Sequence, residues 1–234
     1  MSFKTELHCH TNFSGCSNVP PADVVEKYAA AGYSTVVITN HFNPGHLYRE
    51  GSYETLVDGI FGAIEETRRA AEGRLNILAG MELTLRCMPN DFLLYGVTKE
   101  FFTDMGEELF DLRPWQVRDK IHEYGGIIVG AHPFRFGQVV VNPDELDGLE
   151  VFNGHTGQYS HNEISKAWAL AWLDKYGKNS EFVLTSGTDH HDHDHYPTGG
   201  ILTDEEITSN EQLISVLKSG LYDRITAHLG RVEF

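Results

Sequence analysis

Short apolar runs that stop at polar residues recur along the chain and predict a sheet of buried strands. Residues 34–39 and 127–131 are apolar or β-branched without alternation, which is typical of parallel strands covered on both faces. Runs of this kind, together with one alternating segment at the start, predict strands over 6–11, 34–39, 75–80, 92–97, 127–131, 148–152, 182–185, 200–203 and 224–227.

Segments with apolar residues at the helical period lie between these strands. One of them begins at Pro20-Pro21 and ends at Gly32, which are typical start and stop signals of a helix. The pattern predicts helices over 20–32, 53–72, 114–124, 160–176 and 210–219. Strand and helix therefore alternate about seven times, as in a barrel of βα units or an open doubly wound sheet.

Polar residues follow nearly every predicted strand, and this favours the barrel. In a βα barrel the strand ends meet at one face and carry the site, whereas an open sheet gathers ligand groups at one switch point. His8 and His10 lie two residues apart on a strand, so their side chains point to the same side. Residues 186–195 form the densest cluster, a loop in which histidine and aspartate are mixed.

Composition narrows the classes of function. The chain has 234 residues and 41% hydrophobic residues, so we expect one domain over 1–234 with an ample core. The formal charge of −16 disfavours nucleic-acid polymers and anionic membranes as partners. We expect a cytoplasmic protein, because no apolar run approaches a membrane span and the N-terminus lacks a signal-peptide pattern. The three cysteines lack a disulfide or zinc-finger spacing and are expected to be free thiols.

Imidazole and carboxylate groups at the strand ends suit zinc, manganese or iron. A carboxylate such as Glu82 can bridge two ions, and neighbouring cations generate a bound hydroxide and neutralise phosphate oxygens. No dinucleotide or P-loop motif is present, and no GxSxG elbow supports Cys9, Cys16 or Ser186 as a nucleophile.

Six short motifs occur in an order and spacing that resemble one family. They are His8-x-His10-Thr11, Thr39-Asn40-His41, Gly80-Met81-Glu82, Ala131-His132-Pro133, Glu150-x-x-Asn153 and Ser186-Gly187-Thr188-Asp189-x-His191. Together they resemble the polymerase and histidinol phosphatase (PHP) superfamily over about residues 6 to 195. The resemblance implies a distorted (β/α)7 TIM-like barrel with two or three divalent metal ions at the carboxyl ends of its strands.

The resemblance also implies a set of metal ligands. His8, His10, Glu82 and Asp189 are expected to hold one ion. Glu82 is expected to bridge to a second ion that also takes His132, while His41 and His191 are expected to hold a third. Asp189, His132, Glu82 and His191 form the predicted catalytic set.

The chain departs from the family pattern in three places. Asn40 replaces an aspartate, which puts in doubt an outer hydrogen bond that orients a ligand. Cys16 is the nearest candidate for a missing ligand of the third ion, and a thiolate would favour zinc over manganese. Asp91 is the candidate substitute for a histidine expected near the fourth strand. For both residues a structural role remains open.

The predicted function is hydrolysis of a phosphate monoester on a small molecule, such as histidinol phosphate or a nucleotide, by attack of a metal-bound hydroxide. Arg135, His155 and His193 are the predicted substrate contacts, although Arg135 suits a surface ion pair equally well. His155, His190, His193 and His195 are interpreted as loop residues that can shuttle a proton. Two alternatives stay open: an amidohydrolase-like barrel that cleaves a C–N or C–O bond, and a catalytically weak barrel that binds a phosphorylated ligand.

Overall fold

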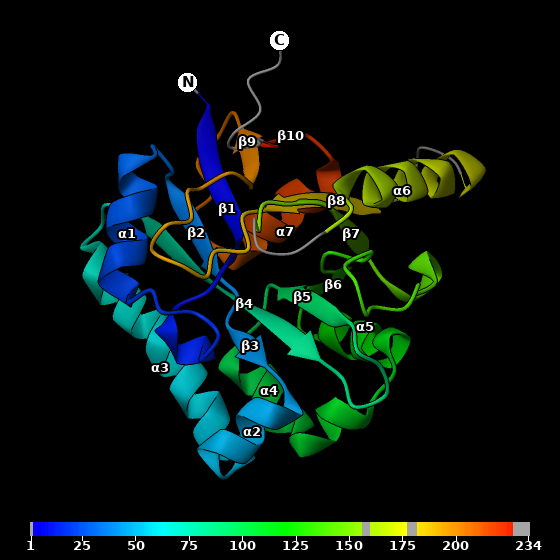
Figure 1. The fold of residues 1–234 in the computed structure, drawn as a ribbon, viewed down its shortest axis with the longest axis horizontal. Helices are drawn as coiled ribbons and strands as arrows, with labels where there is room; N and C mark the ends of the chain where they lie inside the picture. Colours follow the sequence, from blue (N-terminus) through cyan, green and yellow to red (C-terminus); the bar gives the residue numbers. More distant parts are fainter. Residues whose placement is uncertain (1, 156–159, 177–181, 227–234) are drawn as a thin grey trace.

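The computed structural model describes residues 2–155, 160–176 and 182–226, and its strands wind round a common axis (Figure 1). The strands are β1 (Phe3–Cys9), β2 (Thr35–Ile38), β3 (His41–Phe42), β4 (Asn76–Thr84), β5 (Asp91–Tyr95), β6 (Ile127–Gly130), β7 (Gly148–Asn153), β8 (Val183–Gly187), β9 (Ile201–Thr203) and β10 (Asp223–Arg224). Their order in the sheet is β10-β9-β1-β2-β4-β5-β6-β7-β8.

The sheet closes on itself between β8 and β1. The segment after β8 returns to β1 through a parallel bridge between Cys9 and His190, and the backbone N–H of Asp189 donates to the carbonyl of His8 over 2.8 Å. The wall therefore consists of β1, β2 and β4 to β8, with β9 and β10 extending β1 outward. This nearly closed barrel confirms the predicted (β/α)7 TIM-like class.

Within the seven-stranded wall, one strand runs antiparallel to its neighbours and distorts the barrel. β5 pairs antiparallel with both β4 and β6, while β1, β2, β4, β6, β7 and β8 pair parallel where they adjoin one another. A parallel strand ends at the site face, but an antiparallel strand begins there. Asp91 is the first residue of β5 and pairs with Thr84 at the end of β4. Asp91, at the start of an antiparallel strand, therefore reaches the same face as residues at the ends of the parallel strands.

Helices cover the outside of the wall, with α1 and α3 side by side in Figure 1. The α-helices are α1 (Pro21–Ala30), α2 (Pro44–Glu50), α3 (Tyr53–Ala71), α4 (Lys99–Met105), α5 (Pro114–Glu123), α6 (Asn162–Tyr176) and α7 (Asn210–Ser219). Short 3-10 turns are η1 (Asn12–Ser14), η2 (Glu107–Asp111) and η3 (Pro143–Glu145).

Two of these helices were not predicted. The sequence of α2 begins with Pro44-Gly45, which reads as a turn, but the side chain of Asn43 caps it by accepting from the N–H of His46 over 2.8 Å. In α4, Thr98 caps a helix of only 7 residues. Helices this short depend on caps and packing rather than on a long amphipathic pattern.

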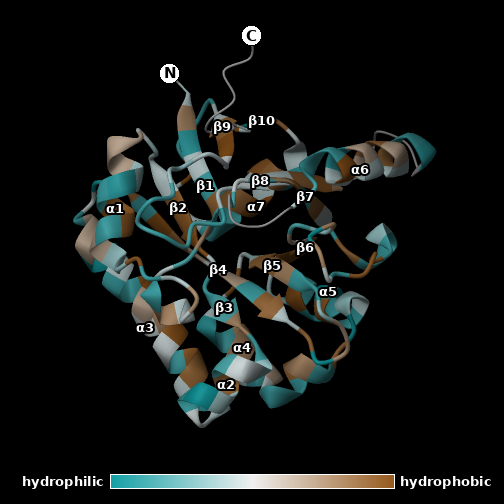
Figure 2. Cartoon of the chain, viewed as in Figure 1, coloured by the Kyte–Doolittle hydropathy of each residue, from teal (hydrophilic) through white to brown (hydrophobic). Residues whose placement is uncertain are grey.

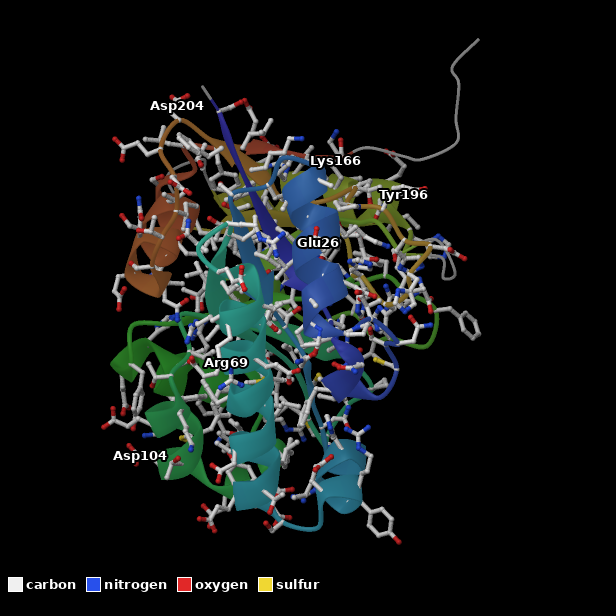
Figure 3. The ribbon with its side chains drawn as sticks, turned by 90° about the vertical axis from the view of Figure 1, so that its left-hand side faces the viewer. Glu26, Arg69, Asp104, Lys166, Tyr196 and Asp204 are labelled. Atoms are coloured by element: carbon white, nitrogen blue, oxygen red, sulfur yellow. The ribbon has the colours of Figure 1, made fainter. Side chains whose placement is uncertain are left out.

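The strands carry the apolar residues and the outer helix faces carry the charge (Figures 2 and 3). Glu26, Arg69 and Asp104 point outward from α1, α3 and α4 in Figure 3. The prediction that Trp168 belongs to the core is wrong: its side chain is 38% exposed and packs edge-on against Phe134. The helix α6 does contact β7, but the buried position is the neighbouring Ala169 rather than Trp168. Among the described residues, no helix has the length and apolar character needed to cross a bilayer.

Candidate metal centre

His8 and His10 face the same side of β1 and the interior of the barrel, as their spacing predicts. Both side chains are fully buried. Nδ1 of His8 lies 2.9 Å from Oε1 of Glu150, and Nδ1 of His10 lies 3.1 Å from Oγ of Ser14. A hydrogen bond at Nδ1 fixes the ring so that Nε2 is directed away from that partner. Each histidine therefore presents Nε2 to the centre of the strand ends.

Two carboxylates face these nitrogen atoms. Oδ1 of Asp189 lies 3.3 Å from Nε2 of both His8 and His10. Glu82 places Oε1 3.4 Å from Nε2 of His8 and Oε2 3.2 Å from Nε2 of His10. An ion held about 2.1 Å from each of four tetrahedral ligands separates the ligand atoms by about 3.4 Å. The observed separations match those of a metal site.

The buried atoms that lack a hydrogen-bond partner provide an independent test of this fit. Within the described ranges, they include Nε2 of His8, Nε2 of His10 and Oδ1 of Asp189, as well as Oε2 of Glu82 and Nδ1 of His41. Buried polar atoms are normally satisfied, because desolvation without a partner is costly. These five atoms all point into one cluster, so the residues present fit divalent cations.

Electrostatics agree with the geometry. Burial opposes ionisation of Glu82, but the charges of His41 and His8 outweigh it and hold the pKa of Glu82 well below its usual range. Burial also opposes ionisation of Asp189, and His8, His10 and Arg135 nevertheless lower its pKa strongly. Burial disfavours a charged His8, yet the pKa of His8 is raised by Asp189, Glu150 and Glu82. The cluster holds ionised carboxylates that require positive charge beside them.

Glu82 also meets a second set of groups. Nε2 of His132 lies 3.0 Å from Oε1 of Glu82, and Nδ1 of His41 lies 3.1 Å from its Oε2. Ligand atoms of His41, Glu82 and Asp91 all lie within 4.8 Å of one another. The structure thus brings Asp91 to Glu82 as expected, but it also brings His41 there, which was expected beside the third ion alone.

A third set of candidate ligand atoms includes the thiol of Cys16. Ligand atoms of His10, Cys16, His41 and His191 lie within 4.8 Å of one another. Nδ1 of His191 lies 3.0 Å from the carbonyl oxygen of Asp189, which again leaves Nε2 for another partner. Burial and the charge of His10 lower the pKa of His191 to about 3, so its ring is neutral and able to donate a lone pair. Cys16 is exposed and not part of a disulfide.

Strained backbone occurs where two of these side chains leave their strands. His132 has φ 28° and Asp189 has φ 55°, in the left-handed region that non-glycine residues rarely adopt. Such conformations persist where surrounding contacts enforce them, and they are enriched at functional sites. Here the N–H of His132 donates to Oε2 of Glu150 over 2.8 Å, and the N–H of Asp189 donates to β1.

Asn40 stands where the family pattern has an aspartate, and it still makes hydrogen bonds that support a proposed metal ligand. Its Oδ1 accepts from Oγ of Ser14 over 2.9 Å and from the N–H of Thr11 over 2.8 Å. Ser14 is therefore free to accept from Nδ1 of His10. The result is a neutral relay from Asn40 through Ser14 to His10, in place of a direct carboxylate contact.

The predicted substrate contacts fall in different places. Nη2 of Arg135 bonds to Oδ2 of Asp189 at 2.6 Å and to Oδ1 of Asn153 at 3.0 Å, so its carboxylate partner lies inside the site. The ring of His155 packs against that of His191 with centroids 5.0 Å apart. His193 is about half exposed, and its Nδ1 lies 3.3 Å from Asp23 of α1.

The residues that orient the ligands were largely missed by the sequence reasoning. Glu150 was part of a motif but received no role, although it contacts both His8 and the backbone of His132. A carboxylate within the apolar run 148–152 was the available signal. Gln138 had no signal: its amide oxygen, in the orientation that suits its neighbours, accepts from Nδ1 of His132 over 2.8 Å.

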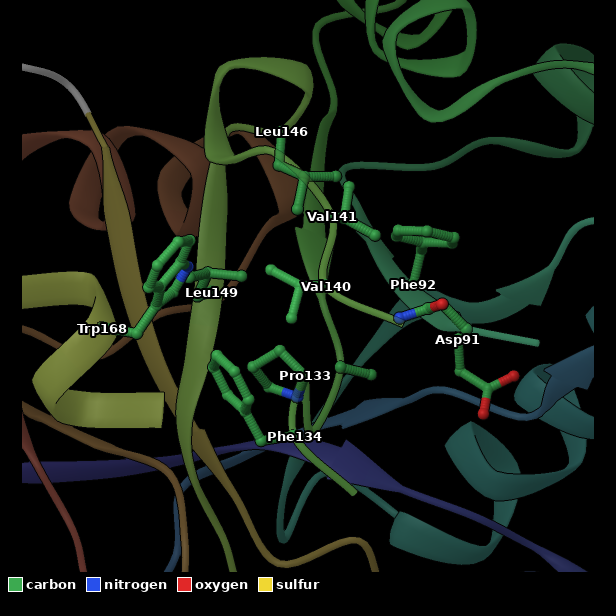
Figure 4. A pocket seen from close by; sticks show the side chains of 12 residues that line it. Asp91, Phe92, Pro133, Phe134, Val140, Val141, Leu146, Leu149 and Trp168 are labelled. Atoms are coloured by element: carbon green, nitrogen blue, oxygen red, sulfur yellow. The ribbon is translucent and has the colours of Figure 1, made fainter. Parts of the chain in front are cut away.

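These side chains surround a pocket of about 460 Å³ at the end of the barrel. Its lining residues are Cys16, His41, Glu82, Pro89, Asp91, Arg135, Phe136, Gly137, Gln138, His155, Asp189, His191 and Asp192. A separate apolar pocket lies between Phe92, Phe134 and Trp168 (Figure 4). Its accessible volume is only about 10 Å³, roughly one water molecule, so it offers no room for a ligand.

A model of the PHP domain matches residues 6–231. The chain belongs to the PHP domain family. A curated relative, the uncharacterized protein MJ1587 of Methanocaldococcus jannaschii, is 23% identical over 196 residues, which cover 73% of this chain and 99% of that protein. The match of the PHP domain model confirms the resemblance identified from the six motifs.

Solved PHP-like structures share the fold. A two-domain protein of Bacteroides vulgatus, described as containing a predicted PHP-like metal-dependent phosphoesterase, superposes with a TM-score of 0.67 at 13% identity and covers 97% of this chain. The lesion-specific endonuclease EndoQ of Pyrococcus furiosus gives 0.63 at 14% identity and covers 96%. The present chain spans 65% and 57% of these two proteins.

A third solved structure matches this chain over nearly the full length of both proteins. It is an amidohydrolase of Chromobacterium violaceum with bound sulfate and no metal, with a TM-score of 0.53 at 15% identity, covering 95% of this chain and 98% of that one. At these identities the solved structures show the shared fold, while the family assignment rests on the PHP domain match over residues 6–231.

Proposed function

We propose that this PHP protein hydrolyses a phosphate monoester of a small molecule with the help of two or three divalent metal ions. The observation that carries the proposal is the convergence of unpartnered ligand atoms from His8, His10, Glu82 and Asp189 at the floor of the 460 Å³ pocket. These residues come from three separate strand ends and would have no reason to converge without a cation between them.

The ligands divide among three positions. His8, His10, Glu82 and Asp189 hold the first ion. Glu82 is shared with the second position, where His132, Asp91 and His41 are within reach. Cys16, His41 and His191 serve the third. Zinc, manganese or iron bound there would lower the pKa of a water molecule and neutralise phosphate oxygens.

The protein groups around these positions bind and orient the substrate. Arg135 is 13% exposed and lines the pocket beside Asp189, so its guanidinium can donate to a phosphate oxygen without leaving the site. Asn153 accepts from the same Nη2 of Arg135 and itself donates to Oδ2 of Asp189 over 3.1 Å. His155 lines the same pocket and is proposed to contact the leaving group, whereas His193 pairs with Asp23 and is left out of the site.

Several observations support a small molecule as the substrate. A volume of about 460 Å³ is typical of pockets for small ligands. Phe136 and Pro89, both exposed, form an apolar part of the rim beside the charged floor. This arrangement suits a phosphate bound at the floor with an organic group directed outward. The formal charge of −16 disfavours a long nucleic acid.

The amidohydrolase alternative has less support. A carboxylated lysine that bridges two ions is the mark expected of such a site, and no lysine is among the described residues that line the pocket. Glu82, which lies beside both His8 and His132, would serve both ions instead. The alternative of a binding protein without turnover predicts the same metal content but no product.

The test is phosphate release by the metal-free protein after reconstitution with zinc, manganese or iron. Monoesters such as glycerol phosphate and phenyl phosphate would be compared with a phosphodiester, single-stranded DNA and a panel of amides. The proposal predicts metal-dependent phosphate release from monoesters, and slower or no cleavage of the other substrates. Preferential cleavage of the diester, DNA or amides would contradict it, and metal binding without turnover on any substrate would favour the binding protein.

A further inference from the structure

Glu6 is a fully buried carboxylate for which the proposed chemistry has no use. It lies on β1 two residues before His8, and its side chain is 0% exposed. In the described part of the chain, it makes no ion pair with a lysine or an arginine. A charge in such a position is retained only if hydrogen bonds compensate for its lost hydration.

Five donors surround the two oxygens of Glu6. Oε1 accepts from the backbone N–H groups of Leu7, His8 and Thr188, each over 2.9 Å. Oε2 accepts from the hydroxyl of Tyr28 over 3.0 Å and from the hydroxyl of Thr188. Three of these donors are backbone groups within one residue of a proposed metal ligand. Glu6 therefore contacts the backbone on both sides of the site.

These contacts lie at the seam of the barrel. β1 pairs with β9 only over Phe3 to Thr5, and β8 pairs with β7. Direct backbone bonds between β1 and the segment after β8 resume at His8, which accepts from Asp189. Between these two stretches the carboxylate of Glu6 joins β1 to Thr188. It thus replaces ladder hydrogen bonds where the two edges do not pair.

The seam is also tightly packed, so the distance between β1 and the end of β8 depends on the side chains between them. A Cβ added to Gly187 at the end of β8 would lie 2.3 Å from Cβ of His8 and 2.7 Å from Oε1 of Glu150. The hydroxyl of Thr188 in turn accepts from the N–H groups of Thr198 and Gly199, each over 3.0 Å. Glu6 thereby connects β1, the end of β8 and the 198–199 segment.

We infer that Glu6 is a positioning residue that fixes the separation between His8 and Asp189 through the backbone, and so sets metal affinity at the first position. The inference rests on the proposed metal centre. Nε2 of His8 lies 3.3 Å from Oδ1 of Asp189. Glu6 accepts from the backbone N–H of His8 and from that of Thr188, the residue before Asp189. A small shift of either strand edge would open that separation.

The test compares Glu6→Gln with Tyr28→Phe. The amide keeps the size of Glu6 and its oxygen can still accept from the backbone N–H groups, but its NH2 then faces the donating hydroxyls of Tyr28 and Thr188, and the substitution removes the negative charge that all five donors share. Tyr28→Phe removes one donor and leaves the three backbone contacts intact. Co²⁺ binding to metal-free protein would be measured by chelator competition and by the visible Co²⁺ spectrum, with circular dichroism to verify the fold. Loss of an outer contact typically costs 10- to 100-fold in metal affinity.

We expect Glu6→Gln to bind Co²⁺ about 10-fold or more weakly at the tightest site, with an altered spectrum, and Tyr28→Phe to stay within about 3-fold of the wild type. If Glu6→Gln does not fold, Thr188→Val takes its place, with Thr188→Ser expected to restore affinity. Unchanged affinity and spectrum in Glu6→Gln, or in Thr188→Val where that variant is used, would overturn the inference even if thermal stability falls. A wild-type protein that binds no Co²⁺ would instead overturn the metal centre itself.

Discussion

At the floor of the site pocket, His8, His10, Glu82 and Asp189 are fully buried, whereas at its rim Cys16 and Phe136 are exposed to solvent. The floor histidines have one ring nitrogen bound to an outer partner and the other directed at the cluster. The ring of Phe136 is 94% exposed.

The two regions also differ in how they are supported. Floor ligands belong to strands or follow them directly, and neighbouring strands hold them in register. The rim residues Cys16, Pro89 and Phe136 lie on the loops that follow β1, β4 and β6, where sequence can change at little cost to the fold. We propose that the floor sets metal binding and the reaction, and that the rim sets which ion completes the site and which leaving group is accepted.

Removing a floor carboxylate gives the largest expected effect. Asp189→Asn keeps the shape of the side chain but removes a charge that faces His8, His10 and Arg135. We expect phosphate release to fall by roughly 10³-fold, with loss of at least one bound ion. The matched control is Asp194→Asn in the same loop, which is exposed and should leave both activity and metal content unchanged. Equal metal content and turnover in Asp189→Asn would contradict the assignment.

An outer partner of the floor gives the next effect. Glu150→Gln retains the size of the side chain but weakens the support of Nδ1 of His8 and of the backbone at His132. Metal affinity should fall roughly 10- to 100-fold, as measured by chelator competition. Glu66→Gln, an exposed change on α3, is the control. If both variants bind metal alike, the rigidity of the floor does not depend on Glu150.

At the rim, Cys16→Ser tests the third metal position alone, because Cys16 is proposed as a ligand of that position only. A thiolate prefers zinc over manganese, so the variant should lose affinity for zinc at one position by about 10-fold while manganese binding changes little. With Co²⁺, we expect the wild type to show a sulfur-to-metal charge-transfer absorption that Cys16→Ser lacks. Cys87→Ser, at the other exposed cysteine, should retain it. Persistence of the band in Cys16→Ser would show that Cys16 is not a ligand.

The smallest effect is expected at Phe136. Stacking of an aromatic group on the ring contributes about 0.5–1.5 kcal/mol, so Phe136→Ala should lower kcat/KM for phenyl phosphate by up to about 10-fold. Glycerol phosphate should be cleaved at an unchanged rate. Val139→Ala, an exposed apolar residue of the same loop, is the matched control. An equal loss on both substrates would mean that the rim does not select the leaving group.

The floor could be predicted from sequence because its residues are tied to strand ends. His8 and His10 alternate on one strand, and Glu82, His132 and Asp189 follow apolar runs, so a barrel was enough to bring them together. Asp91 was named only as a substitute for a histidine that the family resemblance led us to expect, and the antiparallel direction of β5 explains why it reaches the same face.

The outer contacts were not predictable in the same way. Ser14 and Gln138 lie in irregular loops whose course depends on packing between distant segments, and no periodic pattern marks them. Arg135 could be named as a candidate, but its bond to Asp189 across 54 positions of sequence follows only from the closed barrel. Trp168 was misplaced because an apolar side chain alone does not show which face of a helix packs on the wall: Ala169 of α6 is fully buried, whereas the neighbouring Trp168 is exposed.

The most direct test of the central claim is an anomalous diffraction measurement on crystals grown with zinc or manganese, recorded at the absorption edge of the metal. The account predicts a peak bounded by Nε2 of His8, Nε2 of His10 and Oδ1 of Asp189, with a second peak beside Glu82 and His132. Absence of any peak among these atoms in a protein that releases phosphate with the same metal would contradict it.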